Sequence, residues 1–345
     1  MDHQPSIAVV ILNWNGINLL KEFLPSVIQH SQYPNTTIYV ADNASSDDSI
    51  EYLKNNYKDT VAIIQNDGNY GYAKGYNVAL QNLKEDYFIL LNSDVEVTEN
   101  WLNPLISLME SDKSIAACQP KLLQYKAKEY FEYAGACGGF VDKHGYPFCR
   151  GRIFDSFEKD EHQYEDTIDI FWASGACLVI RSHLFFESKG FEEDFFAHME
   201  EIDLCWRLQR MGYSIKVCPS STVYHLGGGT LQKMNPRKTY LNFRNNRLMV
   251  TKNIASNRFL FNFIFRDFMD ILAMIQALAY GNLKESYAIL KAFIDFHLML
   301  PKWIQKRRAL KLKLAPIQKS KTYLYPRSIV FQYFIKKIKH FKDLA

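Results

Sequence analysis

Short apolar runs alternate with amphipathic segments over the first hundred residues of the chain. Each run has the length of a buried strand and leads into polar residues, whereas the amphipathic segments repeat their apolar positions at helical spacing. The runs with their polar ends occupy 6–16, 37–49, 61–66 and 86–97, and the helical segments occupy 19–28, 50–57 and 71–83. Strands that alternate with helices predict an α/β fold with a right-handed, mostly parallel sheet.

Polar side chains stand where three of these strands end. In a parallel α/β sheet, ligands bind at the carboxyl ends of the strands. The residues at those ends are Asn13, Asn15, Asp42, Asn43, Asn92, Ser93 and Asp94. We therefore expect the ligand site at this edge of the sheet.

The residues after the first strand narrow the kind of ligand. A dinucleotide dehydrogenase places GxGxxG there, but this sequence reads NWNG, and it contains no GxxxxGK(S/T) phosphate loop. Asp42 and Asp94 offer separate carboxylates instead. A carboxylate can accept hydrogen bonds from a base or a ribose, or hold Mg²⁺ or Mn²⁺ beside phosphates. Such an Asp can equally make a turn or cap a helix.

Three acids crowd into FFAHMEEIDLCWRL, between an aromatic patch and a predicted helix. They could simply be helix-start acids, which the helix dipole favours. Alternatively, one of them takes a proton from a substrate. Asp203 and Arg207 have the i,i+4 spacing of a structural pair. A catalytic base would therefore be Glu200 or Glu201.

Composition agrees with a globular chain. The 345 residues are 48% hydrophobic and 23% charged, which suits one large domain plus an addition, or two domains. None of the six cysteines forms a CxxC pair, so neither a zinc site nor a redox dithiol is indicated. The start of the chain lacks the plan of a signal peptide, and a reducing cytoplasm is the simplest compartment.

The end of the chain is basic and apolar. From Lys302 onward there are 13 Lys and Arg and one acid, which leaves 28 bases and 36 acids in residues 1–301. Such a tail could meet nucleic acid or an anionic membrane. Segments 259–278 and 287–300 favour the membrane, because they predict helices that lie on a bilayer or pack on a core. Neither has the ~18 uninterrupted apolar residues of a spanning helix.

Two details bear on that interfacial interpretation. Polar residues in the first apolar segment recur four apart, on one helical face, at Asn262, Arg266 and Asp270. Residues 329–342 repeat the combination of aromatic residues and lysines. We therefore expect peripheral membrane contact and no binding of nucleic acid.

Seven segments, in order, resemble the family 2 inverting glycosyltransferases of the GT-A fold, and within them the rhamnosyltransferase-like branch. They are VVILNWNG (9–16), ADNASSDDS (41–49), NYGYAKGYNVAL (69–80), LLNSD (90–94), WASGACLVIR (172–181), GFEEDFFAHMEEIDLCWRLQRMGY (190–213) and VYHLGGGT (223–230). The resemblance covers about residues 7–246. Three positions depart from the family pattern: Asp48 replaces a Gly, Asn92 replaces the first Asp of the metal motif, and Glu201 replaces an Asp.

The resemblance implies roles on the donor side. Asp42 would contact the base or ribose of a nucleotide sugar, and Asp94 would bind a divalent metal, Mg²⁺ or Mn²⁺. His225 would be a second metal ligand or a diphosphate contact, and Arg244 a phosphate contact. The other donor-side candidates are Asn13, Asn15, Asn43, Asn69, Gly71, Asn77, Asn92 and Ser93. A turn alone would equally account for Gly71.

The resemblance also implies an acceptor side. Trp172, Ser174 and Gly175 would meet the acceptor, although Trp172 is equally a core residue. The family's base falls on Glu201, with Glu200 as the alternative because a Glu here is longer than the family's Asp.

The implied organisation is a GT-A domain over 1–246 and an amphipathic, basic helical region over 247–345. The nucleotide half would be about 1–100 and the acceptor half about 101–246.

The implied function is metal-dependent, inverting sugar transfer from a nucleotide sugar, with dTDP-rhamnose as the donor of the branch. The acceptor would be a glycan or lipid-linked molecule in cell-surface polysaccharide synthesis, at the cytoplasmic face of the inner membrane. A nucleotidyltransferase is disfavoured, because the Gly/Arg/Lys-rich triphosphate loop of that class is missing. A catalytically silent sugar-nucleotide-binding or scaffold protein is the alternative from another class.

Overall fold

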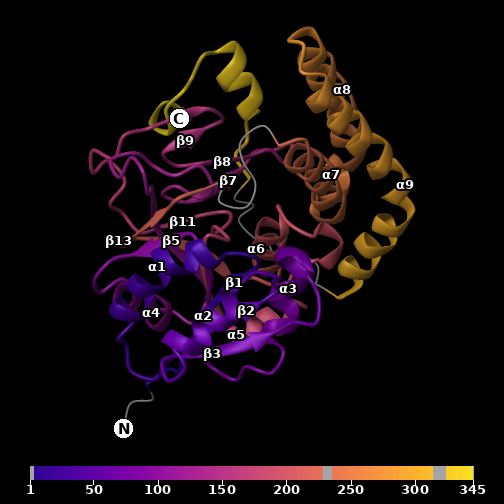
Figure 1. The fold of residues 1–345 in the computed structure, drawn as a ribbon. Coiled ribbons are helices and arrows are strands. Elements are labelled where there is room, and N and C mark those ends of the chain that lie inside the picture. The colour runs from indigo at the N-terminus through magenta and orange to yellow at the C-terminus, as the bar shows by residue number, and fades with distance from the viewer. Residues whose placement is uncertain (1–3, 228–234, 314–323, 345) are drawn as a thin grey trace.

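A computed structural model describes residues 4–227, 235–313 and 324–344 (Figure 1). Its first elements follow the predicted alternation of strands and helices. They are β1 (Ile7–Asn13), α1 (Ile17–His30), β2 (Thr36–Asp42), α2 (Ser49–Asn56), β3 (Val61–Gln65), α3 (Gly71–Leu80), β4 (Tyr87–Asn92), β5 (Val95–Val97) and α4 (Leu102–Ser111).

The later elements add short strands and then helices. They are β6 (Ile115–Gln124), β7 (Gly139–Val141), β8 (Pro147–Cys149), β9 (Arg152–Ile153), β10 (Ser156–Phe157), β11 (Ile168–Asp169), β12 (Cys177–Arg181), α5 (Ser182–Glu187), η1 (Glu193–Phe195), α6 (Glu200–Arg210), β13 (Ser214–His225), α7 (Pro236–Asn253), α8 (Ser256–Ala279), α9 (Leu283–Lys313), η2 (Phe331–Ile335) and η3 (Phe341–Leu344).

The central sheet is mixed but mostly parallel, as predicted for the fold class. Among the described residues its strand order is β11-β13-β6-β12-β4-β1-β2-β3, with β5 paired to β13. The four predicted strands are confirmed, and β1, β2, β3 and β4 run parallel. Strand β12 runs antiparallel to both β4 and β6. Helices cover both faces of this sheet, so the strands read as continuous apolar runs.

The last predicted run, 86–97, divides into two strands. A turn at Ser93 and Asp94 separates β4 from β5. Strand β5 pairs antiparallel with the end of β13, and His225 is the pairing partner of Val95. This turn therefore brings Asp94 and His225 together although 131 residues separate them.

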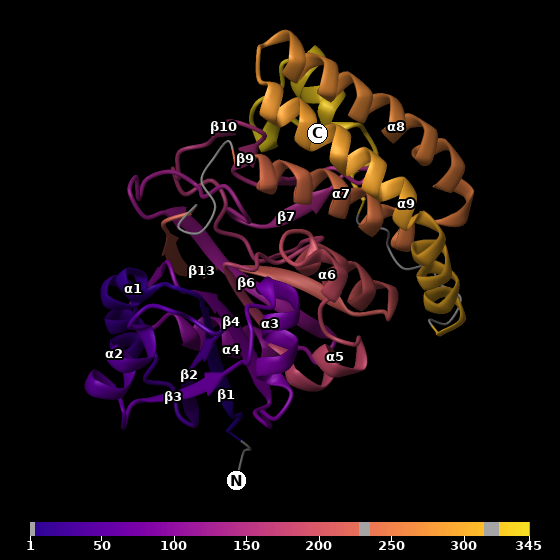
Figure 2. The ribbon, with the colours of Figure 1, turned by 45° about the vertical axis from the view of Figure 1, so that its right-hand side comes forward.

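A small antiparallel sheet of β7, β8, β9 and β10 lies beyond the central sheet, among the described residues. The C-terminal segment packs on it: Phe148 and Ile153 share a cluster with Ile329 and Leu344. Figures 1 and 2 show α7, α8 and α9 on one side of the molecule, with the yellow C-terminal segment returning toward β8 and β9.

Helices α8 and α9 confirm the two predicted apolar helices and form an antiparallel hairpin (Figure 2). The face with Asn262, Arg266 and Asp270 is buried against the protein. Large apolar side chains point outward instead, and Leu260 and Leu298 are 67% and 74% exposed. Within the residues that the structure describes, no helix is long and apolar enough to cross a membrane.

The basic tail does not begin as a separate segment at Lys302. That residue lies inside α9, which continues to Lys313. Trp303 is fully buried in the main core, and Arg307 donates to the carbonyl oxygen of Thr251. The first part of the tail is therefore part of the folded body, and the proposed division at residue 246 falls inside α7.

Candidate active site

The ends of β1 and β2 carry a buried polar pair. Asn13 donates from Nδ2 to Oδ1 of Asp42 over 3.0 Å, and the backbone of Ser45 donates to the other carboxylate oxygen over 2.9 Å. These bonds fix the Asp42 carboxylate at the predicted strand edge. Asn15 lies beside them on the surface and accepts from the backbone of Ser46 over 2.7 Å.

His225 lies between two carboxylates. Its Nε2 is 3.1 Å from Oδ1 of Asp94, and its Nδ1 is 3.2 Å from Oε1 of Glu132. All three side chains are buried. Burial alone would lower the pKa of His225, but the two carboxylates dominate and raise that pKa to about 10. The Asn92 amide is 3.4 Å from the same Nε2, and Ser93 completes the half-buried turn.

These residues fit a divalent metal. The Asp94 oxygen and the His225 nitrogen converge within 3.1 Å, so both can reach one ion. An imidazole that binds a metal through one nitrogen usually holds a carboxylate with the other, which is the position of Glu132. Carboxylate plus imidazole suits Mn²⁺ and does not exclude Mg²⁺.

The acids at the start of α6 have two different environments. Glu200 is buried and Glu201 is half-buried, and one carboxylate oxygen of each is buried without a hydrogen-bond partner. Burial raises the pKa of Glu201 to about 7. Burial, and then the neighbouring Glu201 charge, raise the pKa of Glu200 well above its usual range. These two groups can therefore hold protons near neutral pH.

Asp203, by contrast, is fully paired. It accepts from Arg207 over 2.8 Å, from Lys252 over 2.9 Å and from Asn253 over 2.7 Å. Burial would raise its pKa, but Lys252 and Arg207 outweigh burial and lower the pKa to about 2. The predicted pair with Arg207 is confirmed, and Asp203 stays ionised as part of a structural network.

The loop before α6, residues 192–199, has an unusual backbone. Phe196 has φ 65° and ψ −58°, and His198 and Met199 also have positive φ values of 70° and 76°. Each such conformation is costly for a residue with a side chain and persists only where its surroundings hold it. We call this segment the acid loop, because it leads directly into Glu200 and Glu201.

Residues 69–77 (NYGYAKGYN) contact the acid loop. The backbone amides of Tyr72 and Ala73 donate to the carbonyl oxygen of Phe196 over 2.7 and 3.1 Å. Gly71 has φ 71°, and a Cβ there would lie 2.6 Å from the Phe196 ring. Asn77 brackets the backbone of Phe191 with two hydrogen bonds of 2.9 Å. Asn77 also donates to Glu193 of the loop over 3.2 Å. Gly71 and Asn77 thus contact this loop, and their donor-side roles stay predictions.

Two further Asn candidates serve the turn before α3. Asn43 is buried and donates to the carbonyl oxygen of Gly71 over 2.9 Å. Asn69 is exposed, and its Oδ1 accepts from the backbone of Gly71 over 3.0 Å. Asn69 is the one of this pair whose side chain is open to a ligand.

The acceptor-side candidates lie mainly in the core. Trp172 is 4% exposed, and its indole donates to the carbonyl oxygen of Phe140 over 3.1 Å. Ser174 is buried and donates to Ala134. The carbonyl oxygen of Gly175 accepts from the Tyr72 hydroxyl over 2.7 Å. Trp172 therefore packs the core in this structure, and contact with an acceptor stays a prediction for all three.

The guanidinium of Arg244 is bonded to other groups of the protein. It donates to Asn245 and Tyr240, and at 3.1 Å to the carbonyl oxygen of Asp194. The phosphate role proposed for Arg244 stays a prediction. Gly228, Gly229 and Thr230 of the motif after His225 lie outside the described residues.

Sequence reasoning missed three residues of this region. Glu132 supports His225, Tyr72 joins the acid loop to Gly175, and Asn245 binds three carbonyl oxygens of the loop. Burial raises the pKa of Tyr72 well above its usual value, and Tyr76 and the neighbouring acids Glu200 and Glu201 add to this shift. A polar NFRNNR run at the centre of α7 was the available signal for Asn245.

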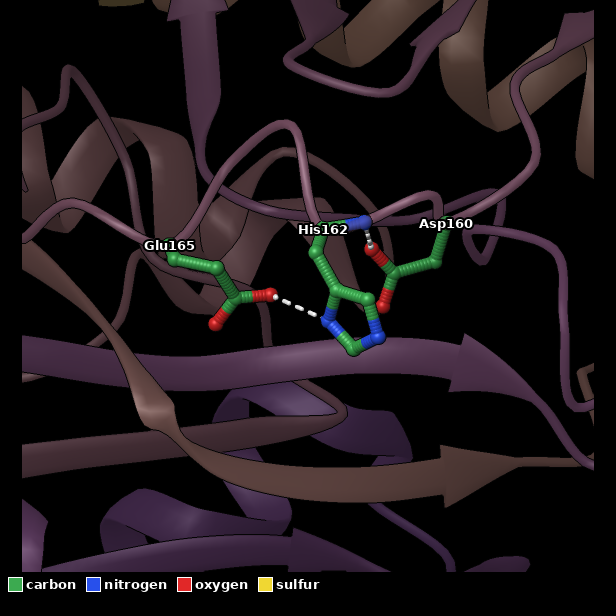
Figure 3. Close-up of side chains that lie close together, drawn as sticks. All are labelled: Asp160, His162 and Glu165. Atoms are coloured by element: carbon green, nitrogen blue, oxygen red, sulfur yellow. Dashed lines mark hydrogen bonds and ion pairs between the residues drawn. The ribbon is translucent and has the colours of Figure 1, made fainter.

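A cluster of two acids and one histidine lies apart from these residues, in a surface loop (Figure 3). Asp160, His162 and Glu165 turn their side chains toward one another, and Nδ1 of His162 is 3.3 Å from Glu165. Lys121 already contacts both carboxylates, at 2.9 Å from Asp160. Its ammonium group supplies the positive charge that a metal ion would bring, so we assign no ligand to this group.

The mostly parallel sheet, with Asp94 and His225 together at its strand ends, is that of a GT-A glycosyltransferase. The family model of glycosyl transferase family 2 matches residues 8–183. The chain belongs to this family.

Individual relatives are distant. The low-salt glycan biosynthesis hexosyltransferase Agl10 of Haloferax volcanii is 22% identical over 255 residues, which covers 72% of this chain and 76% of that protein. The N-acetylglucosaminyl-diphospho-decaprenol L-rhamnosyltransferase of Mycobacterium tuberculosis is 24% identical over 233 residues, or 64% and 75% of the two chains. The rhamnosyltransferase-like resemblance is thereby confirmed.

A solved structure shares the fold. The crystal structure of GalNAc-T7 with UDP, GalNAc and Mn²⁺ aligns with a TM-score of 0.57 at 18% identity. The alignment covers 92% of this chain and 59% of that one.

Proposed function

We propose that this protein transfers a sugar from a nucleotide-sugar donor to a hydroxyl of a glycan or lipid-linked acceptor, with inversion. The supporting observation is the contrast within one helix turn: Glu200 and Glu201 each have one buried carboxylate oxygen without a hydrogen-bond partner, while Asp203 is fully neutralised. An unpaired acid with a pKa near neutrality is suited to take up a proton. The rhamnosyltransferase relative favours dTDP-rhamnose as the first donor to test.

Glu201 is the base in this proposal. The acceptor oxygen bonds to the anomeric carbon while the bond from that carbon to the diphosphate oxygen breaks. The acceptor proton passes to the Glu201 carboxylate, and the nucleoside diphosphate leaves with the bonding electrons. Burial and the neighbouring Glu201 charge raise the pKa of Glu200 well above its usual range, which favours the form of Glu200 that adds no second charge to the site.

The strand-end residues bind the donor. Asp42 would accept hydrogen bonds from the base or ribose, and Asp94 with His225 would hold Mg²⁺ or Mn²⁺. That ion would neutralise charge on the departing diphosphate. Glu132 fixes the ring of His225 through its Nδ1 contact.

Transfer of labelled sugar from a panel of nucleotide sugars tests the reaction. We expect transfer that chelator abolishes and that Glu201→Gln nearly abolishes. A protein that binds a nucleotide sugar but neither transfers nor hydrolyses it would instead be the silent binding or scaffold protein. The departures Asn92 and Glu201 from the family pattern keep that alternative worth testing.

We also propose that the C-terminal region contacts a membrane peripherally, at the cytoplasmic face of the inner membrane, through the outer face of the α8–α9 hairpin. Its apolar residues include Leu260, Phe261, Ile264, Phe268, Ile271, Leu272, Ile275, Leu283, Tyr287, Ile294 and Leu298. In a typical surface helix the apolar side chains face the protein core, whereas here they face outward.

The charges on the hairpin favour an anionic bilayer as the occupant of this face. Every exposed charged side chain over 256–310 is basic: Arg258, Lys284, Lys291, Lys302 and Arg308. Of these, Lys302 pairs with Asp194 of the acid loop and is not counted toward the bilayer. The acids of this stretch face inward, and Asp270 pairs with Arg247 at 2.8 Å. Each base near an anionic surface adds about 1 kcal/mol, on top of apolar burial.

Vesicle sedimentation of the full chain tests this contact. Phe268→Ser should weaken binding, and Lys284→Glu should weaken binding to phosphatidylglycerol vesicles more than to neutral ones. Phe186→Ser is the matched control, because Phe186 is an exposed aromatic residue on α5. Binding that none of these changes affects, or burial of the face in a dimer seen by ultracentrifugation, would overturn the proposal.

A further inference from the structure

We infer that Asn245 of α7 and Trp303 of α9 are positioning residues for the reaction, because they hold the acid loop in the strained form that presents Glu200 and Glu201. The inference rests on the proposed function only in taking that loop to carry the base. It makes the C-terminal helices part of the active site as well as the region of membrane contact.

The acid loop needs outside support. Phe196, His198 and Met199 all have positive φ, and none of them is a glycine. A free loop of this sequence would leave these conformations, because β-carbon contacts disfavour them. The last of the three immediately precedes Glu200, so a relaxed loop would displace the start of α6.

Asn245 supplies this support from α7. Its Nδ2 lies 2.9, 2.8 and 2.9 Å from the carbonyl oxygens of Phe195, Ala197 and His198. The side chain is fully buried, and its Oδ1 accepts from Nε of Arg244 over 2.9 Å. The Arg244 contact orients the amide so that its two hydrogens face the loop.

Side chains of helix α9 also contact the acid loop. The Phe195 ring stacks on Trp303 with centroids 5.2 Å apart and an angle of 19°, and both rings are fully buried. Lys306 bonds Glu192 and Asp194, and Lys302 lies 2.7 Å from Asp194. Side chains of α9 thus contact the loop in three places within five residues.

Loss of this support should change turnover more than donor binding. In the proposed function the acids act on the acceptor, whereas Asp42, Asp94 and His225, at separate strand ends, would bind the donor. A shift of a base by about an ångström is enough to lower a rate by ~10². The donor site should keep its affinity.

The test compares Asn245→Leu, Asn245→Gln and Trp303→Leu with the control Asn262→Leu. Leu matches Asn in size but cannot donate to the carbonyl oxygens, whereas Gln keeps the amide. Asn262 is also a buried amide on a C-terminal helix, but it donates to the carbonyl oxygen of Lys143 over 3.1 Å and lies away from the loop. The measurements are kcat, donor Kd, melting temperature and amide exchange of residues 192–199.

We expect Asn245→Leu and Trp303→Leu to lower kcat by ~10², with donor Kd within about threefold and faster exchange confined to the acid loop. Asn245→Gln should recover part of kcat. Asn262→Leu should lower the melting temperature while kcat is retained. Unchanged loop exchange in Asn245→Leu, or an equal loss of kcat in Asn262→Leu, would overturn the inference.

The exchange measurement needs no turnover, so it separates this inference from the proposed reaction. A wild-type protein without transferase activity would defeat the reaction alone. Loop exchange that stays slow in both Asn245→Leu and Trp303→Leu would defeat the positioning role alone.

Discussion

Proton transfer to Glu201 predicts a specific pH dependence of turnover. The carboxylate must be ionised to accept the acceptor proton, and burial raises its pKa to about 7. Turnover should therefore rise with pH through this value. For a single group, the ionised fraction is roughly one eleventh at one pH unit below the pKa and roughly ten elevenths at one unit above it. Turnover at saturating donor and acceptor should increase ~10-fold from pH 6 to pH 8.

The substitution that isolates this group is Glu201→Gln. It preserves shape but removes the proton acceptor, so turnover should fall by ~10²–10⁴, the usual effect of a positioned base. The rise through pH 7 should disappear with it. Donor affinity should change little, because the proposed donor contacts are made by Asp42, Asp94 and His225 and not by Glu201 on α6.

Release of nucleoside diphosphate, followed from pH 5.5 to 8.5, measures both effects. Glu200→Gln is the matched control: burial and the Glu201 charge raise the pKa of Glu200 well above its usual range and favour its neutral form, so a neutral Gln there should cost less. Near-normal turnover in Glu201→Gln with an inactive Glu200→Gln would move the base to Glu200. A flat wild-type profile, or activity in both variants, would refute the assignment of a base to this segment.

Three further predictions concern the residues around the site. Asp94→Asn should abolish transfer and weaken nucleotide binding only when metal is present, which calorimetry with and without Mn²⁺ would show; equal activity in excess chelator would contradict it. Glu132→Gln should lower Mn²⁺ affinity by ~10–100-fold through loss of the carboxylate behind His225, measured by Mn²⁺ titration, and unchanged affinity would remove Glu132 from the site. Asp203→Asn should lower the melting temperature with little change in donor affinity. Because the folded-state pKa of Asp203 is lowered to about 2, its contribution of about 2 kcal/mol is present above pH 4 and is lost as the pH falls toward 2; acid unfolding that is the same in wild type and variant would argue against this.

Local patterns in the sequence were enough for the strands that carry the donor-side residues. The runs that became β1 and β4 are apolar up to their last residue because they are buried on both faces, and β2 is apolar from Ile38 to Ala41. Their polar ends then place Asn13, Asp42 and Asn92 at one edge of the sheet. The pairing of Asp203 with Arg207 was likewise readable, because four residues along a helix fix the distance between two side chains.

Contacts between segments far apart in the chain could not be predicted from local sequence patterns. No local pattern places Glu132 behind His225, because the turn at Ser93 and the bulged pairing of β13 with β6 decide it. The same holds for Asn245, whose partners lie about fifty residues earlier in the chain. The spacing of Asn262, Arg266 and Asp270 correctly predicted one helical face, but which side of α8 faces the protein depended on partners such as Arg247 and His144.

With the proposed membrane contact, helix α9 would have two roles, and thermodynamic linkage would connect them. One side turns Leu298 outward, while the other stacks Trp303 on Phe195 of the acid loop. If a bilayer orders this helix, it favours the ordered loop, and the coupling must be reciprocal. An acceptor that binds against the ordered loop would then raise the affinity for vesicles by the same factor by which vesicles raise the affinity for that acceptor. The coupling can therefore be measured either as the effect of vesicles on acceptor affinity or as the effect of acceptor on vesicle affinity.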